Sequence, residues 1–142
     1  MTEIAENGNR SIMCRGVRGA TTISENTGVA ILEATRELLT KLSEANNIQP
    51  EDLASITFTT TTDVNAEYPA LAARQLGWHD IALLCGHEME VPGALPMCIR
   101  ILMHWNTALR QTEIQHIYLN EAVNLRPDRN IQFKTTKQAA NQ

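Results

Sequence analysis

The feature that most constrains the fold is one amphipathic segment, residues 28–46, with a strand-like segment on each side of it. Apolar residues recur in it at three- and four-residue steps, which places them on one face of an α-helix: Ile31, Ala34, Leu38, Leu42 and Ala45. Thr27 is suited to cap the amino end of this helix, and Asn46-Asn47 is suited to end it. Residues 13–22 are short and bounded by a turn-like sequence, and residues 53–61 are rich in β-branched residues, so both are predicted strands.

The segments that follow continue this alternation. Residues 63–77 are predicted as a loop and a short helical piece, residues 81–85 as an apolar strand, and residues 86–93 as a connection. Residues 93–106 are predicted as a second helix, because one side of it would carry Leu95, Cys98, Ile99, Leu102 and Met103, with Pro96 in the first turn. Residues 113–120 are predicted as a strand, and residues 122–127 are a candidate extension of it. The order predicts an α+β (mixed α/β) domain, with one sheet and helices on one face.

Length and charge bound the class of protein. A chain of 142 residues is expected to form one domain, over residues 12–127, with a flexible leader over 1–11 and a flexible tail over 128–142. The net charge is −4 and no Lys/Arg run occurs, which argues against a nucleic-acid binder. No apolar stretch approaches the roughly 20 residues of a membrane span. The polar, acidic first residues are unlike a signal peptide, and an odd count of 3 cysteines indicates reduced thiols, so we expect a cytoplasmic protein.

One face of the predicted sheet is polar and lined by small residues. Arg18 would share its face with Cys14, Gly16 and Ala20, whereas Arg15 would point to the opposite face. Small neighbours leave space above the sheet beside Arg18. In the later strands, the residues expected in the core are Ala54, Ile56, Phe58, Ile117 and Leu119, and those expected on the other face are Ser55, Thr57, Thr59, His116, Tyr118 and Asn120. A polar face of this kind in a small protein predicts that a neighbouring subunit covers it.

The residues that could bind a metal do not form a recognisable set. Cys85-x-His87 is one close pair, and His79, His104 and His116 lie on different predicted elements, so no metal site is expected. Cys85 could be a nucleophile, but a strand-end cysteine that packs under a loop is the favoured interpretation. Cys14 and Cys98 are expected to be small buried residues.

Apart from these residues, arginines on predicted helices and strands are the main indication of a binding site. Arg18, Arg74, Arg100 and Arg126, with a tyrosine and a glutamate on non-core faces, would suit a small anion, because guanidinium groups bind carboxylates in a bidentate manner. Each of these arginines taken alone is more simply a surface ion-pair partner.

Five segments in register resemble one known family. They are RGVRGATT (15–22), D-x-x-A-x-Y-P-A (63–70) followed by Arg74, CGHEMEV (85–91), CIR (98–100) and H-I-Y-L-x-x-A-V-x-L-R-P-D (116–128). Together they resemble the monofunctional, trimeric α/β class of chorismate mutases, and not the all-helical class. The resemblance implies a five-stranded mixed sheet with helices outside, a homotrimer that forms a pseudo α/β barrel, and active sites between subunits. It also implies the conversion of chorismate to prephenate in phenylalanine and tyrosine biosynthesis, without a cofactor or a metal.

The resemblance also implies a role for each site residue. Arg100 would be the cation at the ether oxygen, Arg18 would bind a carboxylate, and Tyr118 would add a hydroxyl donor. Glu88 and Cys85 would contact the ring hydroxyl. The backbone along Leu84, Gly86 and His87 would line the same pocket, with Leu125 and Arg126 helping to close it. The adjacent subunit would supply Tyr68, Ala70 and Arg74.

The chain departs from the family pattern at a few of these positions. Leu71 stands where a lysine is common, Leu84 where a threonine is usual, and Gly86-His87 replaces a Met-Gln type pair. A trimeric carboxylate-binding or deaminase-like protein without mutase activity is the alternative interpretation. It accounts for Arg18 but gives Glu88, Arg100 and Tyr118 no joint purpose.

Overall fold

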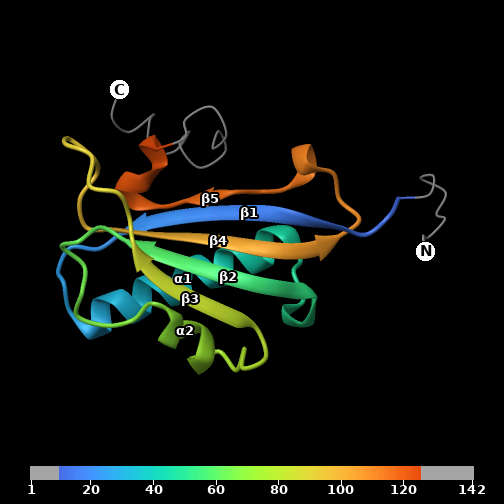
Figure 1. Ribbon diagram of the computed structural model, residues 1–142, viewed down its shortest axis with the longest axis horizontal. Helices are drawn as coiled ribbons and strands as arrows, with labels where there is room; N and C mark the ends of the chain where they lie inside the picture. Colours follow the sequence, from blue (N-terminus) through green and yellow to red (C-terminus); the bar gives the residue numbers. More distant parts are fainter. Residues whose placement is uncertain (1–9, 126–142) are drawn as a thin grey trace.

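A mixed five-stranded sheet with its helices on one face forms the described part of the chain, residues 10–125 of the computed structural model (Figure 1). The sheet order is β3-β2-β4-β1-β5, with β4 antiparallel to β1 and β2, and with the β2–β3 and β1–β5 pairs parallel. The strands are β1 (Met13–Thr22), β2 (Leu53–Thr60), β3 (Ala82–His87), β4 (Cys98–Thr107) and β5 (Ile117–Tyr118). The helices are α1 (Gly28–Asn46) and α2 (Ala70–Gln75), and the 3₁₀ turns are η1 (Pro50–Asp52), η2 (Gln111–Glu113) and η3 (Asn120–Asn124). The predicted fold class is therefore confirmed; Arg126 and the predicted tail lie outside the described residues.

Helix α1 begins and ends where the sequence predicts. The Thr27 hydroxyl accepts a hydrogen bond from the Ala30 amide at 3.1 Å, and Asn47 adopts the left-handed conformation that ends the helix, with φ 55°. Ala45, however, is exposed, so its predicted place in the apolar stripe is wrong. Asn46 takes the inward position instead, because its side chain is fully hydrogen-bonded there. Its Nδ2 donates to Leu42 O and to Gln115 O, each at 2.9 Å, and its Oδ1 accepts from the Gln115 amide.

The core lies between α1 and the sheet. Val17, Leu38, Leu42 and Phe58 are fully buried there. Gly19 is required on this face of β1, because a Cβ at this position would lie 2.9 Å from Leu42 Cδ1. In β2 the register shifts between Leu53 and Ser55, so Leu53 is buried while the predicted core residue Ala54 is exposed.

The predicted second helix, residues 93–106, is wrong: residues 98–107 form β4, the central strand of the sheet. Ile99, Ile101, Met103 and Trp105 alternate with less buried residues and pack under the helices. The spacing fits a helix as well as a strand, and pairing with both β1 and β2 decides between them.

The predicted strand over residues 113–120 is shorter than expected, with β5 limited to Ile117–Tyr118, and its candidate extension is instead the 3₁₀ turn η3. At Asn120 the backbone has φ 55°, which ends the extended run. The expected alternation holds around β5: Ile117 packs in the main core, and Tyr118 lies on the opposite face in a small cluster with Ala20.

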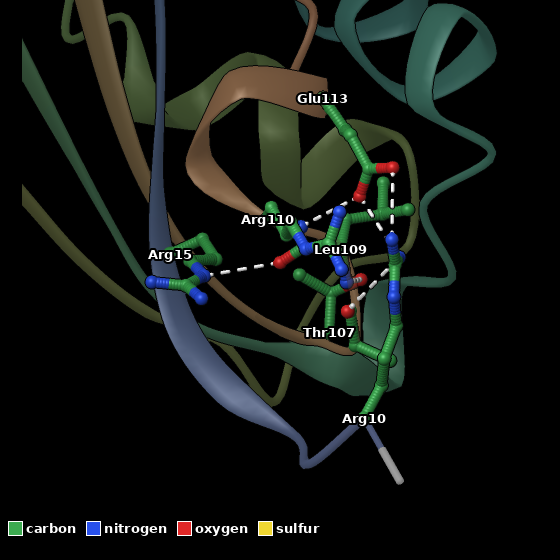
Figure 2. A network of polar contacts seen from close by, with 7 residues as sticks. Arg10, Arg15, Thr107, Leu109, Arg110 and Glu113 are labelled. Carbon is green, nitrogen blue, oxygen red and sulfur yellow. Dashed lines mark hydrogen bonds and ion pairs between the residues drawn. The ribbon is translucent and has the colours of Figure 1, made fainter. Parts of the chain in front are cut away.

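The end of the sheet farthest from η3 is fastened by a polar network (Figure 2). The Arg10 guanidinium donates to both carboxylate oxygens of Glu113, at 2.9 and 3.1 Å, and the Arg110 amide donates to the same carboxylate. These bonds lower the pKa of Glu113 to about 2. Arg15 Nε donates to Leu109 O at 3.0 Å beside this network.

The face without helices carries the residues that the sequence places opposite the core. Strand pairing puts Gly16, Arg18 and Ala20 of β1 beside His104, Leu102 and Arg100 of β4 on this face. Cys14 is on the same face and is exposed, so its predicted burial is wrong, while Cys98 is buried as predicted. Cys14 is exposed because it lies near the open end of the face, whereas Cys98 packs in the cluster around Ala20.

Candidate functional site

A hollow of about 330 Å³ opens on the helix-free face, and its lining includes Arg18, Glu88, Arg100, Tyr118 and Leu125. We call it the Arg100–Glu88 hollow. It lies toward the end of the sheet where β1, β2 and β3 finish and where the β3–β4 connection approaches η3 (Figure 1). Five separate segments of the chain therefore bring these five predicted residues to one place.

Glu88 and Arg100 form an ion pair whose geometry stops short of a hydrogen bond. Arg100 Nε lies 3.8 Å from Glu88 Oε2, and the Thr59 hydroxyl donates to the same oxygen at 2.5 Å. Arg100 Nε is buried and has no hydrogen-bond acceptor among the described residues. A buried N–H without a partner is uncommon in native proteins, so this guanidinium is not fully used by contacts within the chain.

Arg18 and Arg100 stand on neighbouring strands of the same face. Arg18 pairs with Leu102 and Arg100 with Ala20, so the two arginines are diagonal neighbours, about 7–8 Å apart at their Cα atoms. The Arg18 amide donates to His116 Nδ1 at 3.0 Å, which fixes β1 beside the segment that leads into β5. Two cations at this spacing suit a small molecule with two carboxylates.

Small residues make the floor and wall of this hollow. Ala20 lies beneath the ligand space, as the sequence predicts, and packs with Cys98, Tyr118 and Ala122 in a buried cluster. Leu125 packs against that cluster at the end of the described chain. Burial raises the pKa of the Cys98 thiol, against the opposing influence of Arg100, so this thiol is a neutral packing group.

A second hollow, of about 410 Å³, is lined in part by Tyr68, Cys85, Gly86 and His87. We call it the Tyr68–Cys85 hollow. His87 Nδ1 lies 3.1 Å from the Thr60 hydroxyl, which fixes the imidazole at its edge. The side chain of Tyr68 is largely exposed. The predicted site residues are thus divided between two hollows of one chain.

The Cys85 thiol does not reach the Arg100–Glu88 hollow. Cys85 is in register with Phe58 and packs against the core under the helices, so its side chain lies on the face opposite Arg100. Burial raises the pKa of this thiol, although the Ala70 backbone and Arg74 act in the other direction. A protonated thiol on the helix side is unsuited to nucleophilic chemistry, in agreement with the interpretation drawn from the sequence.

The remaining predicted residues of the described chain lie on β3 and on α2. Leu84 is 67% exposed on the helix-free face. Ala70 is buried at the start of α2, whereas Arg74 of the same helix is exposed. These residues do not meet the Arg100–Glu88 hollow within one chain.

No group of three or more metal-ligating side chains occurs within residues 10–125. A membrane-spanning helix, which needs both sufficient length and an apolar composition, is not found in that range either. All three cysteines of the chain are unpaired.

Thr59 lines the Arg100–Glu88 hollow and is a residue that the sequence did not single out for function. It was expected on the polar face, but its bond to Glu88 depends on how the chain continues beyond β3. The only available signal was its position on a polar face near the end of a strand.

Comparison with known proteins gives one consistent family. Residues 14–129 match the family described as chorismate mutase type I. The chain is 54% identical over 117 residues to the chorismate mutase AroH of Thermus thermophilus, covering 82% of this chain and 96% of that one. It is 43% identical over 118 residues to AroH of Bacillus subtilis (strain 168), covering 82% and 93%. The fold is similar to a solved chorismate mutase from Clostridium thermocellum, with a TM-score of 0.74, 47% identity, and coverage of 75% of this chain and 96% of that one.

Proposed function

Because this chain belongs to the type I chorismate mutase family, we propose that the Arg100–Glu88 hollow binds chorismate and accelerates its rearrangement to prephenate. The observation that carries this assignment is that Arg100 and Glu88 line the same hollow 3.8 Å apart, with no hydrogen-bond acceptor for Arg100 Nε among the described residues. Opposite charges are thereby held apart within one small hollow.

The rearrangement requires no nucleophile or general base from the protein. Chorismate rearranges in a single intramolecular step, in which one C–O bond breaks while one C–C bond forms. The protein has to select the compact reactive conformer and stabilise the charge that develops. The ether oxygen gains negative charge and the ring fragment gains positive character, so a fixed cation and a fixed anion are the groups required.

The residues of the hollow fit these two tasks. Arg100 would donate to the ether oxygen, and Arg18 would bind a carboxylate. The Tyr118 side chain lines the same hollow and would contribute a hydroxyl donor. Glu88 would accept a hydrogen bond from the ring hydroxyl, and its negative charge would favour the positive character of the ring fragment.

The rate acceleration expected of such an enzyme requires more than one stabilising group. A millionfold acceleration corresponds to roughly 8 kcal/mol of barrier. One well-placed donor to a developing oxyanion supplies about 3–4 kcal/mol. Binding of the reactive conformer by Arg18 and Tyr118, with the charge of Glu88, would supply the remainder.

We propose a homotrimer in which each site is completed by an adjacent subunit. Two features support this arrangement: the helix-free face exposes Leu84 and Leu102, and Tyr68 and Arg74 lie away from the Arg100–Glu88 hollow of their own chain. A neighbouring copy would bring its Tyr68, Ala70 and Arg74 to that hollow. Cys85, Gly86 and His87 would then contribute through the backbone of β3, which is an edge strand of the described sheet.

Three further elements of the proposal concern closure of the hollow, the bounds of the domain and the compartment. We propose that Leu125 and Arg126 close the hollow, which is supported by the contact of Leu125 with the cluster around Tyr118. Residues 12–127 would form the catalytic domain. Three unpaired thiols support a cytoplasmic location.

Turnover of chorismate tests the function directly. The purified protein should consume chorismate, followed by its ultraviolet absorbance, and yield prephenate, identified by chromatography. Arg100→Ala should lose nearly all of this activity, whereas Arg36→Ala, on the outer face of α1, should keep it. A folded protein that binds chorismate without converting it would support the carboxylate-binding alternative.

A further inference from the structure

We propose that Thr59 is a positioning residue that holds the Glu88 carboxylate in its working orientation and keeps it from closing onto Arg100. The inference deepens the proposed function and rests on it. Thr59 lies on β2, between β3, which leads to Glu88, and β4, which carries Arg100. It is in register with Gly86 of β3 and with Arg100 of β4. Its side chain is on the helix-free face and lines the Arg100–Glu88 hollow.

The backbone brings Glu88 within reach of Thr59. Glu88 follows the last residue of β3, and its amide donates to Thr60 O at 2.9 Å, so the main chain stays beside β2 for one more step. The Glu88 side chain then turns to the helix-free face, where the Thr59 hydroxyl donates to Oε2 at 2.5 Å. A β-branched donor has few rotamers, so it holds this bond at a small cost in entropy.

The two carboxylate oxygens of Glu88 therefore differ. Oε2 is bound by Thr59 and faces Arg100 Nε at 3.8 Å, whereas Oε1 has no hydrogen-bond partner among residues 10–125. Oε1 is therefore the oxygen that can accept a hydrogen bond from a hydroxyl of the substrate.

Thr59 also protects Arg100. Without a competing donor, a carboxylate beside a guanidinium turns to make two parallel hydrogen bonds of about 2.7–2.9 Å. Such a pair would occupy Nε of Arg100, which is buried and without an acceptor in the described structure. By holding Oε2, Thr59 keeps the cation available to the ether oxygen and the anion available to the ring fragment.

Kinetics of four chains test this role: wild type, Thr59→Val, Thr59→Ser and Thr40→Val. Valine keeps the shape of threonine without the hydroxyl, and serine keeps the hydroxyl. We expect Thr59→Val to lower kcat about tenfold or more, as expected for loss of a hydrogen bond to a charged group, with KM changed less than about threefold. Thr59→Ser should recover most of kcat. Thr40→Val makes the same change on α1, away from this hollow, and should stay within about twofold of wild type.

A crystal structure of the Thr59→Val chain supplies a readout that does not depend on activity. We expect Arg100 Nε and Glu88 to move from 3.8 Å into direct hydrogen-bond distance. Wild-type kinetics in Thr59→Val, or a Glu88 carboxylate that keeps its place without the hydroxyl, would overturn the positioning role while leaving the proposed function intact. A wild-type protein that does not convert chorismate would overturn the proposed function, and the structure of the variant would still decide whether Thr59 orients Glu88.

Discussion

Replacing Arg100 by lysine separates charge from geometry at the proposed site. The ion pair with Glu88 is a small part of stability: two unit charges 3.8 Å apart attract by about 4 kcal/mol at an effective dielectric constant of 20. The Arg100 side chain is 43% exposed, so solvent screening reduces the net value to about 1 kcal/mol or less. Lysine keeps the charge, and the fold should persist.

Catalysis should respond far more strongly than stability. As an oriented donor to the developing oxyanion, Arg100 would stabilise the transition state by about 3–4 kcal/mol, which is about 100- to 1,000-fold in rate. An ammonium group cannot reproduce the planar fork of a guanidinium. Arg100→Lys should therefore lower kcat at least about 100-fold.

The assay is chorismate consumption, followed by absorbance, with a thermal melt of each variant in parallel. Arg36→Lys, a change of the same kind on the exposed face of α1, is the matched control and should leave kcat unaltered. An Arg100→Lys protein with a normal melting temperature and kcat within about threefold of wild type would refute the role given to Arg100.

Three further predictions concern stability, pH and the thiol. Gly19→Ala should destabilise the fold by about 1–3 kcal/mol, measured by denaturant unfolding, because the added Cβ meets Leu42 Cδ1 at 2.9 Å and Ile117 O at 3.1 Å; unchanged stability would contradict this packing. The pKa of Glu113 is lowered to about 2, so its pairing with Arg10 stabilises the fold above the ordinary carboxyl pKa and is lost as pH falls toward 2. The difference in melting temperature between wild type and Glu113→Gln should accordingly shrink between pH 5 and pH 2, and a difference independent of pH would contradict the assignment. Cys85→Ala should keep kcat/KM within about tenfold of wild type, because its thiol lies on the helix side and acts neither as base nor as nucleophile; loss of all turnover in a folded variant would contradict that placement.

Local sequence patterns predicted the elements whose neighbours are close in sequence. Helix α1 was readable because its apolar stripe and both ends are encoded within residues 27–47. Strand β4 was not, since Cys98, Ile99, Leu102 and Met103 satisfy a helical spacing while Ile99, Ile101, Met103 and Trp105 satisfy a strand. Pairing with β1 and β2 decides between them, and that pairing is not visible locally.

The candidate site, too, could be predicted only in part from local sequence patterns. Pattern alone indicated arginines suited to an anion, and the resemblance to a family was needed to join Arg18, Glu88, Arg100 and Tyr118. The structure brings these four to one hollow. Thr59 could not be predicted, because its bond joins the end of β2 to a residue beyond the end of β3.

A mixing experiment tests most directly whether the active sites form between subunits. Arg100→Ala removes one of the two cations of the hollow, and Arg74→Ala alters the surface that the neighbouring chain would contribute. Each variant alone should be nearly inactive. In a cyclic trimer, every mixed assembly regains one intact site, so equal co-expression should restore about one quarter of wild-type turnover. Mixed trimers that are verified by mass and remain as inactive as the separate variants would contradict a site shared between chains.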